Sequence, residues 1–318
     1  MNPDKVSFLI AAYNEENFLR ECIQSCLDQQ EADIEVCVVD DGSSDNTRKI
    51  IEEMMADPRV KGGFLPLNKG KVAAFNLAYS MATGEYISLV GADDVNVNTR
   101  SKLSIDALKL NNANLVYADY YVCDKDLKIM RVKKTGEDVR LSDLAFNNRV
   151  SGGTTMFDRT VACKVFPIPA LLPFEDWWIA FIARLYFNVV RLDVPILFYR
   201  HHGRNDSVSG SGLIRSKKKD YMRHMAYYSE FLDFARVSGD VPAPIVSRFL
   251  ESGIFKKMYV QDGFSSRLKT SYDFISGNGL PRTSIGWAAL LGILPFGPHL
   301  FDLAFAAKEL MLSKRKKS

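Results

Sequence analysis

The chain has 318 residues and a net charge of +3, with 47% hydrophobic and 25% charged residues. This composition is typical of a globular protein, and the small net charge gives no reason to expect nucleic acid as a partner. Five cysteines without a CxxC pair exclude a cysteine-type metal cluster and fit buried thiols in a reducing compartment.

The first half of the chain alternates short β-rich runs with helical patterns. Strands are predicted at Val6–Ile10, Ile34–Val39, Phe64–Leu67, Tyr86–Val90 and Leu115–Tyr121. Helices are predicted between them, including Lys71–Met81 and Arg100–Leu110. Such alternation predicts an α/β fold, a Rossmann-like and mostly parallel sheet with helices on both faces.

The second half of the chain is less regular. A helix is predicted at Val139–Phe146, and Gly152-Gly153 indicates a loop that enters a strand. A strong helical pattern follows Pro173, and Val189–Tyr199 is strand-like.

The last hundred residues are predicted to be mostly helical, and part of them is strongly apolar. Thr283–Phe301 contains no Asp, Glu, Lys or Arg, but Pro295 interrupts it, whereas crossing a bilayer takes about 20 apolar residues in one helix. Two interpretations stay open: segments lying in a membrane interface, with Leu300–Leu312 amphipathic, or an apolar hairpin packed on the protein. Basic runs at Lys217–Lys219 and Lys314–Lys317 fit a solvated face or an anionic membrane surface.

Polar clusters follow three of the predicted strands, and in open α/β sheets ligands bind beyond the carboxyl ends of the strands. Tyr13 can stack on a nucleotide base, and Asp41 can accept a hydrogen bond from a base N–H. Asp93 and Asp94 offer hard carboxylate oxygens, which suit Mg²⁺ or Mn²⁺. An isolated Asp-Asp pair is more often a turn or a helix cap, but repetition at successive strand ends favours a site.

Four motifs together resemble glycosyltransferase family 2, whose members have the GT-A fold. They run in order along the chain, and the resemblance extends from residue 6 to about residue 205. The motifs are Val6-Ser-Phe-Leu-Ile-Ala-Ala-Tyr-Asn-Glu15, Val38-Val-Asp-Asp-Gly-Ser-Ser-Asp-Asn-Thr47, Asn68-Lys-Gly-Lys71 and Thr83-Gly-Glu-Tyr-Ile-Ser-Leu-Val-Gly-Ala-Asp-Asp94.

The resemblance implies roles at the donor end of the site. Ala11, Tyr13 and Asp41 match positions that hold the nucleoside, and Asp93 matches a residue near the donor ribose. Asp94 matches a metal ligand, so Mn²⁺ or Mg²⁺ is the implied cofactor.

The donor end includes two further positions, Lys71 and Gly91. Lys71 lies where the family often places groups near the donor. The family usually reads Asp-Ala-Asp-Asp at the fourth motif, whereas this chain has Gly91-Ala92 before its acidic pair. The first carboxylate of the motif is therefore missing here.

On the acceptor side, Glu175-Asp176 matches an acidic pair of the family, which implies that Asp176 is the general base. Acids at the start of a helix also stabilise the helix dipole, by about 0.3–1 kcal/mol. Arg200-His-His-Gly-Arg-Asn205 resembles the family's Arg-x-His-x-x-Asn segment, with His202 preferred over His201 as a ligand of the metal or the diphosphate. Arg200 and Arg204 are expected to contact the diphosphate.

The function that the resemblance implies is an inverting, metal-dependent glycosyltransferase in cell-surface polysaccharide synthesis. The donor is a nucleotide-diphosphate sugar, by default a UDP-sugar, and the acceptor is a glycan or a lipid-linked saccharide. Residues 1–115 are expected to bind the nucleotide sugar and 116–210 the acceptor, with a helical C-terminal region at 211–318. We expect a cytoplasmic protein, with peripheral attachment to the cytosolic face of the membrane as one interpretation.

Two other functions are compatible with such a fold. A nucleotidyltransferase that makes nucleotide sugars should carry a Gly-rich basic loop after the first strand, where this chain has Ala11-Ala12-Tyr13. A non-catalytic nucleotide-binding module should have lost Asp94 or Asp176, and both acids are present. A dinucleotide enzyme is disfavoured because no GxGxxG follows the first strand.

Overall fold

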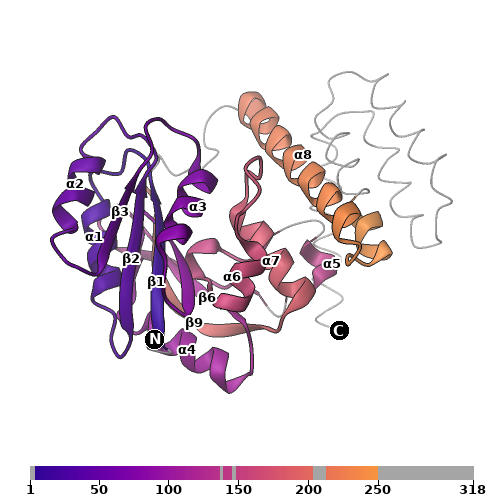
Figure 1. Cartoon of the computed structure of the whole chain (residues 1–318), viewed down its shortest axis with the longest axis horizontal. Helices are drawn as coiled ribbons and strands as arrows, with labels where there is room; N and C mark the ends of the chain where they lie inside the picture. The colour runs from indigo at the N-terminus through magenta and orange to yellow at the C-terminus, as the bar shows by residue number, and fades with distance from the viewer. Residues whose placement is uncertain (1–3, 137–138, 145–147, 203–212, 250–318) are drawn as a thin grey trace.

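The computed structural model describes residues 4–136, 139–144, 148–202 and 213–249 (Figure 1). These residues form one sheet of nine strands, with helices packed against it. The strands are β1 (Lys5–Ala12), β2 (Asp33–Asp40), β3 (Val60–Phe64), β4 (Tyr86–Gly91), β5 (Val95–Asn96), β6 (Leu115–Cys123), β7 (Ile129–Lys133), β8 (Met156–Asp158) and β9 (Val189–Arg200). The helices are α1 (Leu19–Leu27), α2 (Thr47–Met54), α3 (Lys71–Met81), α4 (Arg100–Leu110), α5 (Leu141–Leu144), the 3₁₀ turn η1 (Gly152–Thr154), α6 (Arg159–Val165), α7 (Glu175–Tyr186) and α8 (Leu213–Ser238).

The order of the strands brings the carboxyl ends of β1, β2 and β4 to one edge. The sheet runs β3-β2-β1-β4-β8-β6-β9-β5, and β7 pairs with β6. The four strands from β3 to β4 are parallel to one another, as are β6 and β9. β8 lies antiparallel between β4 and β6 and joins the two parallel groups. The predicted α/β fold is confirmed, with antiparallel strands inserted into it.

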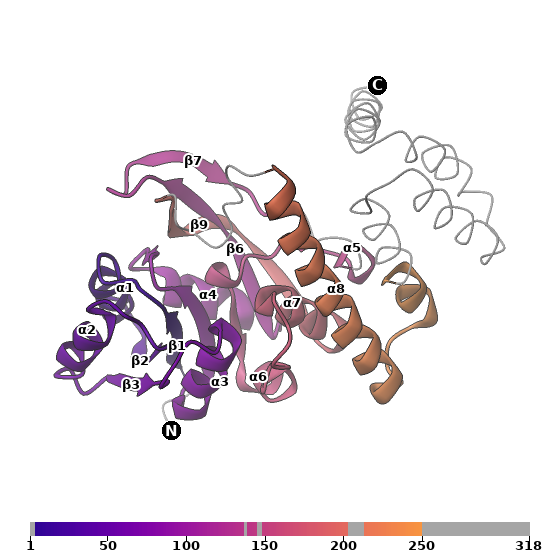
Figure 2. The same cartoon turned by 90° about the horizontal axis from the view of Figure 1, so that it is seen from above.

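Alternate residues of the central strands pack on opposite faces of the sheet, because side chains alternate along a strand. Phe8 and Ile10 of β1 belong to the core under α1, α2 and α4. Leu9 belongs to the core formed with α3, α6 and α7. α8 runs across α7 (Figure 2), where Tyr227 stacks on Trp177 with ring centroids 4.2 Å apart.

Two predicted elements differ from the structure. The predicted strand Phe64–Leu67 is wrong, since β3 ends at Phe64 and begins at Val60. Glycines obscure this strand in the sequence, yet a Cβ added to Gly62 would lie 2.5 Å from the sulfur of Met55. The predicted helix Val139–Phe146 is shortened to α5, and its last residues lie outside the described ranges.

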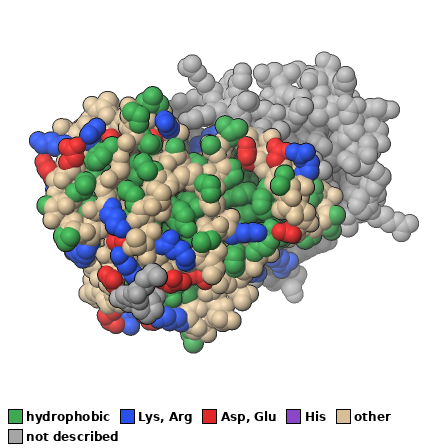
Figure 3. All heavy atoms as spheres, in the orientation of Figure 1, with side chains coloured by type: hydrophobic (Ala, Val, Ile, Leu, Met, Phe, Trp, Pro, Cys, Tyr) green, Lys and Arg blue, Asp and Glu red, His purple; other side chains and the backbone are tan. Residues whose placement is uncertain are grey.

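Within the described ranges, no helix is long and apolar enough to cross a bilayer. The predicted apolar segments Thr283–Phe301 and Leu300–Leu312 lie outside the described residues. Figure 3 shows basic and acidic side chains mixed over the visible face, without a large region of one sign.

A buried arginine fastens α4 to the sheet behind the pocket. The Arg100 guanidinium is fully buried and donates to the Ser88 hydroxyl at 2.6 Å and to the carbonyls of Leu89 and Thr155 at 3.2 Å each. Burial lowers the pKa of Arg100 to about 10, so the group stays charged at neutral pH. These bonds hold β4 against the segment that leads into β8.

Replacing Arg100 by Met is expected to reduce the free energy of unfolding by about 3 kcal/mol or more. The substitution leaves several buried acceptors without a donor, and each unsatisfied group costs about 1–3 kcal/mol. Urea denaturation measures the change. Lys102→Met, on the same helix with a side chain 41% exposed, is the matched control and should stay within about 0.5 kcal/mol. Equal stability of the two variants would contradict a fastening role for Arg100.

Candidate active site

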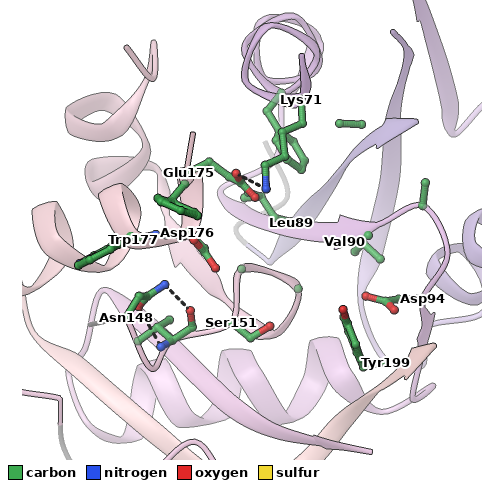
Figure 4. A pocket seen from close by; sticks show the side chains of 18 of the residues that line it. Lys71, Leu89, Val90, Asp94, Asn148, Ser151, Glu175, Asp176, Trp177 and Tyr199 are labelled. Atoms are coloured by element: carbon green, nitrogen blue, oxygen red, sulfur yellow. Dashed lines mark hydrogen bonds and ion pairs between the residues drawn. The ribbon is translucent and has the colours of Figure 1, made fainter. Parts of the chain in front are cut away.

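The polar clusters predicted from the sequence converge on one pocket at the carboxyl edge of the sheet (Figure 4). One wall follows β1, β2 and β4, and the other consists of η1, the segment before it and the start of α7. The predicted residues that line the pocket are Ala11, Tyr13, Asp41, Lys71, Asp93, Asp94 and Asp176. The structure thus brings together donor-side and acceptor-side candidates that are far apart in sequence.

The nucleoside end of the pocket contains an aromatic ring that is open to solvent. Tyr13 keeps 46% of its surface exposed, so the ring is available for stacking on a base. Ala11 lies at the end of β1, in register with Gly91 of β4. Its small side chain leaves room for a ligand beside the strand.

Asp41 is buried beneath this end and supports the loop that leads into α3. Its two carboxylate oxygens accept hydrogen bonds from the amides of Lys69 at 2.7 Å and Gly70 at 2.8 Å. Carboxylate oxygens carry further lone pairs, which leaves acceptor capacity for a base N–H. Gly42 has a φ of +71°, and a Cβ there would lie 2.5 Å from the backbone of Leu67. The two loops can therefore pack against each other only with glycine at this position.

Asp94 is a buried acid of the pocket edge, with 3% of its surface exposed. The amide of Arg200 donates to its Oδ1 at 3.0 Å. Burial, and then the neighbouring charge of Asp93, raise the pKa of Asp94 well above its ordinary value. Burial and the charge of Asp93 disfavour the ionised form of this carboxylate, and a cation bound beside it would stabilise that form.

These residues fit a divalent cation that also binds phosphate oxygens. Within the described ranges, no group of three His, Cys, Asp or Glu side chains is placed to hold a metal by itself. Mg²⁺ at phosphate sites is usually bound by one or two carboxylates, with phosphates and waters completing its shell. Asp94, with Asp93 beside it, supplies a donor set of that kind.

Gly91 stands where the family motif has its first carboxylate. A Cβ added at this position would lie 2.7 Å from Oδ2 of Asp94 and 2.9 Å from Oδ1 of Asp93. A larger residue would have to displace one of the two acids. The glycine therefore allows both remaining carboxylates to occupy the end of β4.

The segment after β9 is tied to this acidic pair. His202 Nε2 lies 3.0 Å from Asp93 Oδ2, whereas His201 is exposed. Arg200 is 3% exposed, and its Nε donates to the carbonyl of Asp93 at 2.8 Å. Arg200 therefore ties the end of β9 to the acidic pair, which differs from the predicted diphosphate contact, and Arg204 lies outside the described residues.

Asp176 lies across the pocket, at the start of α7 (Figure 4). Its Oδ1 accepts a hydrogen bond from the amide of Trp177 at 2.7 Å. A Cβ at Gly152 would lie 3.0 Å from Cβ of Asp176. The glycine therefore lets the backbone of η1 approach Asp176 closely. The hydrogen bond from Trp177 holds one carboxylate oxygen in place.

A salt bridge connects the two walls of the pocket next to Asp176. Lys71 Nζ, at the start of α3, lies 2.8 Å from Oε2 of the buried Glu175. Burial and then the charge of Glu175 raise the pKa of Asp176 to about 6, while Lys71 acts in the opposite direction. Lys71 was predicted near the donor, and its ammonium group also reaches the acceptor wall.

Activity is expected to fall as the pH drops through about 6, because a general base must be ionised and the pKa of Asp176 is about 6. Lys71→Met removes the charge that lowers this pKa, so the acid limb of kcat should move to higher pH. Glu175→Gln removes the charge that raises it, so the limb should move to lower pH. A pH series of kcat tests both variants beside wild type. Shifts of the same sign in the two variants would contradict this electrostatic coupling.

The sequence analysis did not single out several residues of the acceptor wall. Tyr120 of β6 and Tyr199 of β9 line the pocket with ring centroids 5.7 Å apart. Asn148 and Ser151 line it from the segment before η1. The two tyrosines lie within strand patterns, and only the pairing of β6 with β9 places them together.

The fold and the pocket define the class of the protein, an α/β protein whose ligand pocket opens at the carboxyl edge of the sheet. Residues 7–171, more than half of the chain, match the family described as glycosyl transferase family 2. The chain belongs to this family, as the motifs predict.

Curated relatives and solved structures agree with this assignment. An uncharacterized glycosyltransferase of Haemophilus influenzae is 30% identical over 50% of this chain, and the match spans 64% of that relative. The Escherichia coli protein WfgD, named UDP-Glc:alpha-D-GlcNAc-diphosphoundecaprenol beta-1,3-glucosyltransferase, is 26% identical over 72% of this chain and 87% of its own length. TarS residues 1–349 of S. aureus, solved with UDP-GlcNAc, superposes with a TM-score of 0.65 at 18% identity, over 96% of this chain and 92% of that one. This last likeness shows the shared fold.

Proposed function

We propose that the chain transfers a sugar from a UDP-sugar to a hydroxyl group of a saccharide acceptor, with inversion at the anomeric carbon. The observation that carries the proposal is the placement of Tyr13, Asp41, Asp94 and Asp176 around one pocket. Tyr13 and Asp41 can bind the nucleotide base, and Asp94 can bind the diphosphate through a cation. Asp176 offers a general base on the opposite wall.

The donor end is matched to a nucleotide diphosphate. Tyr13 stacks on the base, Asp41 accepts from a base N–H, and Asp93 lies near the ribose. Uracil is the base that we propose, because its ring N–H can donate a hydrogen bond to the Asp41 carboxylate. The structural similarity to a protein solved with UDP-GlcNAc supports this choice.

Asp94 would hold a divalent cation, Mn²⁺ or Mg²⁺, with His202 as a further ligand or as a contact of the diphosphate. Such a cation neutralises the charge that develops on a departing diphosphate. The burial of Asp94 and its raised pKa support this role. Arg200 fixes the backbone from which His202 projects.

Asp176 is the proposed general base. The acceptor oxygen forms a bond to the anomeric carbon, the bond from that carbon to the diphosphate oxygen breaks, and the hydroxyl proton passes to Asp176. Attack from the face opposite the leaving group inverts the configuration. The hydrogen bond from the amide of Trp177 holds one oxygen of the carboxylate in place during this step.

The acceptor that we propose is a glycan or a lipid-linked saccharide of cell-surface polysaccharide synthesis. The acceptor named for WfgD, a saccharide on diphosphoundecaprenol, supports the lipid-linked form. We also propose that the enzyme works at the cytosolic face of a membrane, where it would meet a lipid-linked acceptor. Residues 4–115 supply the donor wall, and 116–202 supply most of the acceptor wall.

A donor screen tests the proposed function. Purified protein is incubated with UDP-, GDP- and dTDP-sugars and Mn²⁺, Mg²⁺ or a chelator, and release of the nucleotide diphosphate is followed. The expected result is release from a UDP-sugar that requires the metal. Release of pyrophosphate from a nucleoside triphosphate and a sugar phosphate would indicate a nucleotidyltransferase. Binding of UDP-sugars without turnover in the presence of lipid-linked saccharides would indicate a non-catalytic module.

A further inference from the structure

The acceptor wall of the pocket ends in a set of basic side chains that the proposed mechanism does not use. Lys133, Lys134 and Arg149 line the pocket, and all three are exposed. None of the ion pairs between described residues involves them. Within the pocket lining, the acids Asp41, Asp93 and Asp94 lie on the donor wall, and Glu175 and Asp176 lie at the start of α7. The three basic side chains therefore form a separate basic edge of the acceptor wall, beyond its acidic pair.

The pairing of β6 with β7 directs Lys133 toward the site. Lys133 is in register with Tyr120, and side chains of residues paired in this way project from the same face of the two strands. Tyr120 lines the pocket, and both Asp94 and Asp176 act on its pKa, which is raised mainly by burial. The ammonium group of Lys133 is thus carried on the face of the strands that borders the proposed base.

A buried network fixes the backbone that carries these lysines. Asp119, 2% exposed, accepts hydrogen bonds from the amide and the hydroxyl of Thr135 at 2.9 and 3.0 Å. It also pairs with Arg191 at 3.0 Å. These bonds compensate the buried charge and hold the chain after β7 beside the pocket. The basic edge is therefore built on a fixed segment.

Arg149 approaches the same segment from the other side. A Cβ added to Gly136 would lie 3.9 Å from Nη1 of Arg149. Arg149 precedes η1, where a Cβ added to Gly152 would lie 3.0 Å from Cβ of Asp176. Two separate stretches of the acceptor half thus place cationic groups on one edge, next to the residue that we assign as the base.

We propose that Lys133, Lys134 and Arg149 form a subsite for a phosphate or diphosphate group on the acceptor, next to the sugar that receives the transfer. The inference rests on the proposed function and narrows its acceptor to an anionic, phosphate-bearing saccharide. Arginine and lysine bind phosphate oxygens through charge-assisted hydrogen bonds. A neutral glycan has no group that matches three positive charges.

Binding of pentyl diphosphate tests the subsite directly. Titration calorimetry is run with saturating UDP and Mn²⁺, so that the donor end is filled and only a second anion site is seen. Wild type is expected to bind, while Lys133→Gln/Lys134→Gln and Arg149→Gln should bind at least roughly tenfold more weakly because charge-assisted bonds are lost. Lys128→Gln, which removes an exposed lysine outside the pocket lining, is the matched control and should bind as wild type. Pentanol should not bind.

Three results would overturn the subsite: no binding by wild type, equal binding by all four proteins, or full competition between UDP and pentyl diphosphate. The last would assign these side chains to the donor. Inorganic phosphate and pentyl phosphate, which carry nearly the same charge at slightly alkaline pH, separate the two sources of the anion, since stronger binding of inorganic phosphate would exclude a linked phosphate. Failure of the proposed function is seen separately, as absence of UDP binding by wild type, and the titration is then repeated without UDP.

Discussion

Asp176→Asn is expected to lower kcat for sugar transfer by roughly 10²–10⁴-fold, the contribution typical of general base catalysis. Asn has nearly the same shape and keeps an oxygen that can accept a hydrogen bond from the amide of Trp177. It cannot take a proton from the acceptor hydroxyl. The affinity for UDP should be unchanged, because Tyr13 and Asp41 lie on the opposite wall.

Steady-state kinetics and UDP titration on the same preparation measure these two effects. Asp143→Asn, an exposed acid of α5 in the same half of the chain, is the control and should transfer at the wild-type rate. Full transfer activity in Asp176→Asn would remove the assignment of the base. Loss of UDP affinity together with activity would indicate that the substitution disturbed the fold of the pocket.

Asp94→Ala is expected to abolish metal-dependent binding of UDP. Mutation of groups that only orient a metal ligand costs roughly 10–100-fold in affinity, so removal of the carboxylate itself should exceed that range. Titration of Mn²⁺ in the presence of UDP measures the change. The fold should persist, because the substitution removes a buried carboxylate whose pKa is already raised by burial and by Asp93.

Asp126→Ala, whose side chain is 72% exposed, provides the control for Asp94→Ala. It should bind Mn²⁺ and UDP as wild type does. Thermal unfolding of both variants without metal separates loss of a ligand from loss of structure. Wild-type metal affinity in Asp94→Ala would place the cation elsewhere and leave this acid without its proposed role.

The strands that form the donor wall could be predicted because each one is a short apolar run followed by polar residues. β1, β2 and β4 are buried on both faces, so their sequences are hydrophobic almost without interruption. β7 is exposed at every position, and no periodic pattern marks it. β3 contains Gly62 and Gly63, whose low strand propensity moved the predicted strand to the residues after them. Packing against α2 therefore determines where β3 lies.

The site residues were predicted in the same uneven way. Tyr13, Asp41, Asp93 and Asp94 are parts of local motifs, and the position of strand ends sufficed to group them. The salt bridge between Lys71 and Glu175 joins residues that no local pattern connects. Its effect on Asp176 requires the two walls to be folded against each other.

The basic edge of the acceptor wall was also beyond prediction from the sequence. Lys133 and Lys134 read as an ordinary charged pair in a loop, and Arg149 stands alone in the chain. They share one pocket because β7 folds back on β6 and because Asp119 fixes the segment that follows. The hydrogen bonds of the buried Asp119 thus help to bring these three basic side chains to the same pocket.

The central claim is that acids at the carboxyl edge of the sheet hold a cation and a uridine diphosphate together. A crystal structure of the protein soaked with Mn²⁺ and UDP tests this claim most directly. We expect manganese density at Asp94 in contact with the diphosphate, with the uracil stacked on Tyr13 and its N–H directed to Asp41. UDP bound away from these residues, or an edge without metal at saturating Mn²⁺, would contradict the account.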